Sequence, residues 1–253
     1  MNNFNRRDFL QIAAGGLAVV ALSQSAKAQT KPKIKAVAFD AFPIFDPRPI
    51  FEMVNQLFGE KGPAIANTWR TAQFDYTWLR TSGNQYVDFW KVTEDALIFA
   101  LKKNNATLSE ALRKQIMEQY LHLKAWPDVL PVLTALKAQG IKTAFLSNFT
   151  ADMLNANIKS AELDGYFDLV LSTDKARAFK PSPKAYQLGV DALKLKKEEI
   201  AFAAFAGWDA VGAKWFGYPT YWCNRQNNPL DELSAKPDIV SNGLSGLLDF
   251  VKA

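Results

Sequence analysis

Strand-like and helix-like segments alternate through the second half of the chain, and this alternation is the strongest constraint on its fold. After Trp126-Pro127, short apolar runs typical of buried strands are separated by amphipathic segments. An earlier run of the same kind ends just before Asp40. The predicted strands are 34–39, 141–146, 167–171, 200–206, 220–223 and a short sixth at 238–240. This order predicts an α/β protein built on a doubly wound parallel sheet.

The stretch between the first two predicted strands is different in character. Residues 47–124 show helical periodicity, many aromatic side chains and no strand-like run. We therefore expect an inserted helical cap over the carboxyl edge of the sheet. The predicted domains are a core of residues 29–46 and 125–253 and a cap of residues 47–124.

Polar side chains stand where several predicted strands end. Asp40, Ser147-Asn148 and Asp209 each follow a strand, and Lys180 follows the third strand at the start of a helix. Any one of them is explained as a helix cap. The ordered set indicates a site, because ligands of open α/β sheets bind beyond the carboxyl ends of the strands.

The first 28 residues have the pattern of an export signal. Arg6-Arg7 precede an apolar stretch over 10–22, and small residues end it at Ala26-Lys27-Ala28. This pattern resembles a twin-arginine signal peptide. It predicts a mature chain from Gln29, the twin-arginine export machinery as a partner, and a periplasmic location. The apolar stretch is too short for a stable membrane span across ~30 Å of hydrocarbon.

The amino-acid composition limits the kinds of binding and catalytic site that the chain can form. The chain has 30 Lys and Arg residues against 25 Asp and Glu, a net charge of +5. This positive charge is small, and the basic residues form no stripe with interleaved aromatic residues, so a nucleic-acid-binding function is not indicated. One cysteine, Cys223, excludes an internal disulfide and a cysteine-based zinc site, and one histidine, His122, argues against a Ser-His-Asp triad. The chemistry is therefore left to carboxylates, lysine and arginine.

These segments together resemble the haloacid dehalogenase superfamily, and within it the type II members, the L-2-haloacid dehalogenases. The resemblance covers roughly residues 34–250, including the cap segments 69–70, 76–80 and 93–97. The four motifs of the superfamily correspond to residues 38–42, 146–148, 180–181 and 208–213. The resemblance implies a Rossmann-like core of the haloacid dehalogenase type with an inserted helical cap.

The resemblance also implies a reaction. It is the metal-independent hydrolysis of short 2-haloalkanoic acids to 2-hydroxy acids, with no cofactor. Asp40 would attack the carbon that carries the halogen and form an ester. Lys180 would keep Asp40 ionised, and Asp209 would balance that charge and position the hydrolytic water. Whether the enzyme is a homodimer is left open.

The remaining site residues follow from the same resemblance. Arg70 and Asn148 would receive the departing halide, and Ser147 would hold the substrate carboxylate. An apolar wall around the carbon and the halogen would come from four aromatic residues, Phe42, Phe89, Tyr186 and Trp208.

Two segments depart from the family pattern. The first loop, 40–46, is one residue shorter than usual and lacks a Gly-Thr pair, so a hydrogen bond that orients the nucleophile is missing. The family's Ser-x-Asn before Trp208 is replaced by Ala204-Phe205-Ala206, which removes two partners of the hydrolytic water.

Two other functions stay open at this point. A periplasmic phosphatase on the same fold would need a second aspartate two positions after the nucleophile, where this chain has Phe42, and several oxygen ligands for Mg²⁺. A non-catalytic binder of small carboxylates would not need the set formed by Asp40, Lys180 and Asp209.

Overall fold

The computed structural model describes residues 33–252, which belong to one compact unit. Within that range six strands form one parallel sheet in the order β3-β2-β1-β4-β5-β6. The strands are β1 (Ala36–Phe39), β2 (Lys142–Ser147), β3 (Leu169–Ser172), β4 (Ile200–Ala204), β5 (Thr220–Cys223) and β6 (Ile239–Ser241). The predicted α/β fold is confirmed. The predicted signal peptide, residues 1–28, lies outside the described residues.

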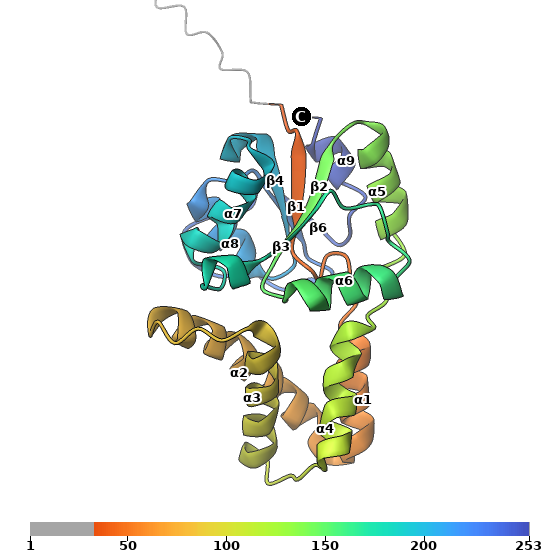
Figure 1. Cartoon of the computed structure of the whole chain (residues 1–253), viewed down its shortest axis with the longest axis vertical. Coiled ribbons are helices and arrows are strands. Elements are labelled where there is room, and N and C mark those ends of the chain that lie inside the picture. Colours follow the sequence, from red (N-terminus) through yellow and green to blue (C-terminus); the bar gives the residue numbers. More distant parts are fainter. Residues whose placement is uncertain (1–32, 253) are drawn as a thin grey trace, which may run out of the picture. The chain divides into compact units, whose positions relative to one another are not determined.

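Helices cover both faces of the sheet and also extend past one end of it (Figure 1). The helices that flank the sheet are α5 (Val129–Ala138), which precedes β2, and α6 (Ala151–Ser160), α7 (Pro183–Leu193), α8 (Gly207–Phe216) and the short α9 (Leu247–Phe250), which follow β2, β3, β4 and β6. Between β1 and α5 lie α1 (Arg48–Phe58), α2 (Gly62–Ser82), α3 (Phe89–Lys103) and α4 (Glu110–Glu118). Single 3-10 turns lie at Gly59–Lys61, Gln119–Leu121, Thr173–Ala176 and Lys197–Glu199.

Strand β1 shows why the sheet is buried on both sides. Its alternate residues enter two separate apolar clusters, Val37 and Phe39 on one face and Ala36 and Ala38 on the other. The first cluster includes side chains of α5, α6 and α9 and continues into the helices α1–α4. The second cluster is formed with α7 and α8. The helical segment thus shares a continuous core with the sheet.

The order of the strands decides where a site can form. Strand β1 pairs with β2 on one side and β4 on the other, so the connections change direction beside β1. A crevice opens at such a switch point, beyond the carboxyl ends of the strands. Figure 1 shows helices α1–α4 lying beyond this same end of the sheet. They fall within the predicted cap, whose limits of 47 and 124 stay a prediction.

Candidate active site

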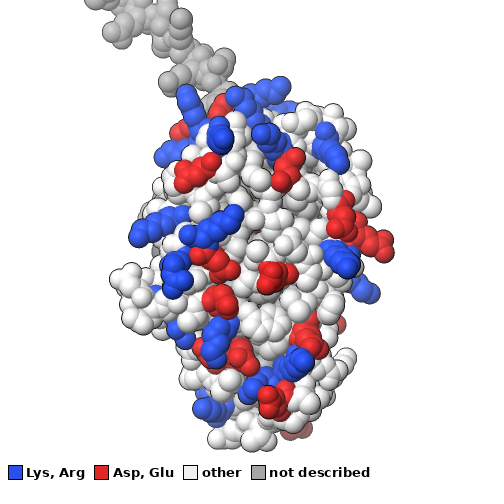
Figure 2. All heavy atoms as spheres, viewed as in Figure 1, with Lys and Arg blue, Asp and Glu red and all other residues white. Residues whose placement is uncertain are grey.

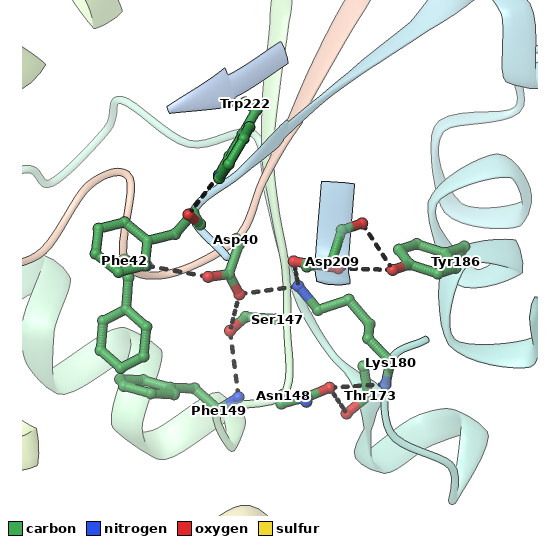
Figure 3. Close-up of polar contacts among 11 residues, drawn as sticks. Asp40, Phe42, Ser147, Asn148, Phe149, Thr173, Lys180, Tyr186, Asp209 and Trp222 are labelled. Carbon is green, nitrogen blue, oxygen red and sulfur yellow. Dashed lines mark hydrogen bonds and ion pairs between the residues drawn. The ribbon is translucent and has the colours of Figure 1, made fainter. Parts of the chain in front are cut away.

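The carboxylate of Asp40, directly after β1, is held on both oxygens (Figure 3). Its Oδ1 atom accepts hydrogen bonds from Lys180 Nζ at 2.9 Å and from Ser147 Oγ at 3.2 Å. Its Oδ2 atom accepts one from the backbone N–H of Phe42 at 3.3 Å. These donors fix the carboxylate at the end of a rigid buried strand, and 13% of the side chain remains exposed. Asp40 is therefore both anchored and accessible.

Lys180 links the two acidic side chains. Its ammonium lies 2.9 Å from Asp40 and 2.6 Å from Asp209, and its side chain is 1% exposed. Burial pulls the pKa of Lys180 down, but the two carboxylates outweigh burial and raise it above its ordinary value. The backbone N–H of Lys180 donates to Asn148 Oδ1 at 3.0 Å, which ties the lysine to the loop after β2. Lys180 thus stays charged between the two carboxylates.

Asp209 lies in the first turn of α8 and is fully buried. Burial, together with the charge of the nearby Asp40, raises its pKa to about 6, against the opposing effect of Lys180. The hydroxyl of Tyr186 donates to Asp209 Oδ1 at 2.6 Å. A carboxylate with a pKa near 6 is suited to act as a general base at neutral pH.

A cavity of about 20 Å³ lies where these groups meet the helical segment. Such a volume holds about one water molecule. One side is polar, formed by Asp40, Asp209 and the loop after β2, and the other side is mostly aromatic. The lining residues are Asp40, Phe42, Phe74, Phe89, Ser147, Asn148, Phe149, Ala206, Trp208 and Asp209. The cavity therefore places the Asp40 carboxylate against an apolar wall.

Most of the residues predicted from the sequence meet here. Lys180 contacts the polar side of the cavity through Asp40 and Asp209. Seven of the predicted residues line the cavity itself: Asp40, Phe42, Phe89, Ser147, Asn148, Trp208 and Asp209.

Two predicted residues are placed elsewhere. Tyr186, expected in the apolar wall, is fully buried beneath α8 and does not line the cavity; its hydroxyl is directed to Asp209 instead. Arg70 is exposed on α2, one helical turn before the lining residue Phe74. Within residues 33–252 the guanidinium of Arg70 has no hydrogen bond or ion pair, and Arg70 does not line the cavity.

Sequence reasoning missed Phe74 and Phe149 as lining residues. Phe74 packs on Trp208 at 5.4 Å between ring centroids, and Phe149 stacks on Phe89 at 5.4 Å. A signal for Phe149 was its position directly after Ser147-Asn148. For Phe74 the signal was its spacing of four residues from Trp78, which puts both rings on one face of α2.

The described residues hold no cluster of three or more His, Cys, Asp or Glu side chains placed to bind a metal ion. Their helices also include none that is long and apolar enough to cross a membrane. Figure 2 shows basic and acidic side chains interspersed over the face in view.

The sequence model of the haloacid dehalogenase-like hydrolases matches residues 23–217. The chain belongs to this family. An (S)-2-haloacid dehalogenase of Pseudomonas sp. (strain YL) is 37% identical over 85% of this chain and 94% of its own length. The (S)-2-haloacid dehalogenase 2 of Pseudomonas sp. (strain CBS-3) is 34% identical over 87% of this chain and 98% of its own length.

A solved structure agrees with these relatives. The L-2-haloacid dehalogenase of Xanthobacter autotrophicus, with chloropropionic acid covalently bound, has a TM-score of 0.79 to this chain. It is 30% identical and covers 87% of this chain and 99% of its own. The similarity places the chain with the type II branch of the haloacid dehalogenase-like hydrolases.

The two alanines that depart from the family pattern lie in different surroundings. Ala206 lines the cavity, next to Trp208 and Asp209. Ala204 is fully buried in the apolar cluster on the side of the sheet that α7 and α8 cover. One of the two substitutions therefore removes a polar group from the cavity itself, and the other lies in the core.

Proposed function

We propose that this haloacid dehalogenase-like hydrolase converts short 2-haloalkanoic acids to 2-hydroxy acids through an ester on Asp40. One observation carries the proposal. A carboxylate in an ion pair with a buried lysine lies against an aromatic wall, in a cavity that also contains a second carboxylate. This arrangement suits attack by an anion on a neutral carbon that bears a leaving group.

In the first step an oxygen of Asp40 attacks C2 of the substrate from the side opposite the halogen. The carbon–halogen bond breaks and the halide leaves with the bonding electrons, so the configuration at C2 is inverted. We assign stabilisation of the halide to Asn148, because Asn148 lines the cavity and its Oδ1 atom already accepts from Lys180 N–H and Thr173 Oγ1, which leaves the side-chain NH₂ as a donor. The role predicted for Arg70 requires the guanidinium to leave its exposed position, and it stays a prediction.

In the second step water attacks the carboxyl carbon of the Asp40 ester. Asp209 accepts the proton from this water, and Lys180 stabilises the negative charge that develops near Asp40. The bond between Cγ of Asp40 and the oxygen attached to C2 then breaks, and that oxygen takes the proton from Asp209 and leaves as the hydroxyl of the 2-hydroxy acid. The oxygen of the water stays in the carboxyl group of Asp40, and the second proton of the water passes to solvent, which restores the Asp40 carboxylate.

A phosphatase is not favoured by this site. Phe42 occupies the position of the second aspartate expected of a phosphatase, and its ring packs edge-on against Phe149 at 5.3 Å within the apolar wall. A phenyl ring at this position cannot donate a proton to a leaving group. A non-catalytic binder is not favoured either, because a buried lysine between two carboxylates is an arrangement that catalysis needs and simple anion binding does not.

Halide release from the separate enantiomers of 2-chloropropionate, with and without EDTA, tests the proposal. We expect release from one enantiomer, an inverted 2-hydroxy acid product and no effect of EDTA. Release that depends on added Mg²⁺, or hydrolysis of phosphate esters far above halide release, would favour the phosphatase.

We also propose that the twin-arginine pattern of residues 1–28 exports the protein to the periplasm, and that residues 47–124 act as a cap domain. Support for export comes from the sequence of this segment. Replacing Arg6 and Arg7 by lysine in the full-length chain should retain the protein in the cytoplasmic fraction of a bacterial host. Equal amounts of both forms in the periplasmic fraction would contradict export by this route.

A further inference from the structure

The loop that carries Asp40 lacks the usual Gly-Thr pair, yet four successive carbonyls of the loop, those of residues 41–44, accept hydrogen bonds. The carbonyl of Ala41 accepts from the backbone N–H groups of Ile44 and Phe45, at 3.1 and 2.9 Å. Each of the next three carbonyls has a donor from outside the loop. Phe42 O accepts from Trp126 Nε1 at 3.0 Å, Pro43 O from Arg225 Nη2 at 3.0 Å, and Ile44 O from the N–H of Trp126 at 3.0 Å. Two distant residues thus hold the loop.

Arg225 is itself rigidly anchored. Its guanidinium forms a two-pronged pair with Asp128, at 2.7 and 3.1 Å, and lies 4.5 Å from the centre of the Trp126 ring. Its side chain is 9% exposed. Burial acts to raise the pKa of Asp128, but hydrogen bonds from Arg225 and from the backbone of Leu244 hold it below its ordinary value. Asp128 is therefore a charged, fixed partner that orients the guanidinium fork.

Phe42 connects the hydrogen bonds that fix the loop to the carboxylate of Asp40. The backbone N–H of Phe42 donates to Asp40 Oδ2, the oxygen that neither Lys180 nor Ser147 contacts. The peptide between Phe42 and Pro43 has no N–H, because proline lacks one. Its carbonyl is the polar group by which the protein can fix this peptide, and Trp126 holds that carbonyl.

We propose that Arg225 and Trp126 are positioning residues for the nucleophile. By holding the carbonyls of Phe42 and Pro43, they direct the Phe42 N–H at Asp40 Oδ2 and so set the angle at which the carboxylate meets the substrate carbon. Neither residue lines the cavity, so both act through the loop. This inference rests on the proposed dehalogenase function and assigns to these two residues the orienting task of the absent Gly-Thr pair.

Rapid-mixing measurements of halide release on the full chain test the proposal. Trp126→Phe removes the indole N–H and keeps an aromatic ring, and Arg225→Ala removes the guanidinium. We expect the rate constant for the first halide to fall about tenfold or more in each variant, because a misdirection of about 1 Å can cost ~10²-fold. The KM for the substrate should change much less, since Ser147 and Asn148 remain in place.

Chemical rescue separates positioning from general damage. In Arg225→Ala, added methylguanidinium can pair with Asp128 and donate to Pro43 O, so it should restore part of the lost rate. Methylammonium carries the same charge but lacks the planar set of N–H donors of a guanidinium group, so it should not restore the rate. If Arg225→Ala does not fold, Trp126→Phe carries the test, with thermal unfolding as the check on its integrity.

Arg48→Met is the matched control. Arg48 also lies over the Trp126 ring, at 4.6 Å, and pairs with Asp46, but its side chain is 62% exposed and holds no carbonyl of the loop. We expect its halide release to stay within about twofold of wild type, as for other exposed ion pairs. An equal loss in Arg48→Met, or wild-type rates in both Trp126→Phe and Arg225→Ala, would overturn the inference. Absence of halide release from the wild-type chain would instead overturn the proposed function, and this inference with it.

Discussion

The hydroxyl of Tyr186 donates a hydrogen bond of 2.6 Å to Oδ1 of Asp209. Tyr186 comes from α7, and Asp209 lies in the first turn of α8. The bond stabilises the ionised carboxylate, so it lowers the pKa of Asp209 against the larger effect of burial. Tyr186 therefore affects the reaction through the proton affinity of Asp209, although its ring does not reach the cavity.

This relationship predicts the pH dependence of ester hydrolysis. Asp209 must be ionised to accept a proton, and its pKa is about 6 while Asp40 is charged. The ester removes the charge of Asp40, so the hydrolysis rate should fall with a midpoint below that value as the pH drops. Loss of the Tyr186 donor raises the pKa of Asp209, so Tyr186→Phe should move this acid limb to higher pH. The carboxylates around Lys180 raise its pKa above the ordinary value, so any alkaline limb due to Lys180 should have its midpoint above that of a free lysine. Single-turnover decay of the ester measured against pH checks both points, and an unmoved limb in Tyr186→Phe would contradict the first.

Asp40→Asn should abolish halide release and leave the fold intact. An amide is a far weaker nucleophile than a carboxylate, while Lys180 keeps its ion pair with Asp209 at 2.6 Å. Halide release and thermal unfolding, measured together, check this expectation. Asp46→Asn is the control, because Asp46 belongs to the same loop but pairs with the exposed Arg48. Appreciable turnover by Asp40→Asn would remove Asp40 from the role of nucleophile.

Hydrolysis of the ester should limit turnover, because Ala206 offers no side-chain hydrogen bond to water in the cavity. Rapid mixing should show a burst of about one halide per site followed by a slower phase. Introducing a hydroxyl with Ala206→Ser should speed the slow phase by about fivefold, the effect of one hydrogen bond of ~1 kcal/mol. Ala204→Ser should not, since Ala204 lies in the core between the sheet and α8. Linear release from the first turnover would show that another group holds the water.

The contact between Tyr86 and Asp174 should contribute measurably to stability. The Tyr86 hydroxyl, just before α3, donates to Asp174 in the turn after β3, and burial together with this bond raises the pKa of Tyr86. Tyr86→Phe should lower the free energy of unfolding by about 1 kcal/mol, as the loss of one such bond does. Denaturant unfolding measures the change. Tyr76→Phe is the control, because the Tyr76 hydroxyl has no hydrogen bond within residues 33–252, and an equal loss in both variants would contradict the assignment.

The sheet and the polar side of the site could be predicted because their signals are local. Strand β5 begins and ends where the apolar run 220–223 does, Asp40 follows β1 directly, and Asp209 lies in the first turn of the helix that comes after β4. Parallel strands carry such residues to one edge whatever the details of packing.

The features of the site that the sequence did not predict depend on how distant segments of the chain pack together. Arg70 and Phe74 are one turn apart on the same face of α2, so the position of the helix along its axis decides which of them meets the cavity; in the fold it is Phe74, which packs against Trp208. Tyr186 is of a residue type that often lines ligand pockets, but in the fold α8 covers it. The hold of Trp126 and Arg225 on the loop at Phe42 and Pro43 joins residues 84 and 182 positions apart, which no local pattern records.

The cavity of about 20 Å³ holds about one water molecule, and aromatic side chains border it, among them Phe74 and Trp208. A 2-haloalkanoic acid is larger than a water molecule, so we expect side chains of this wall to move when the acid binds and when the hydroxy acid leaves. Binding and release then include a conformational step, and we expect turnover to decrease as solvent viscosity is raised.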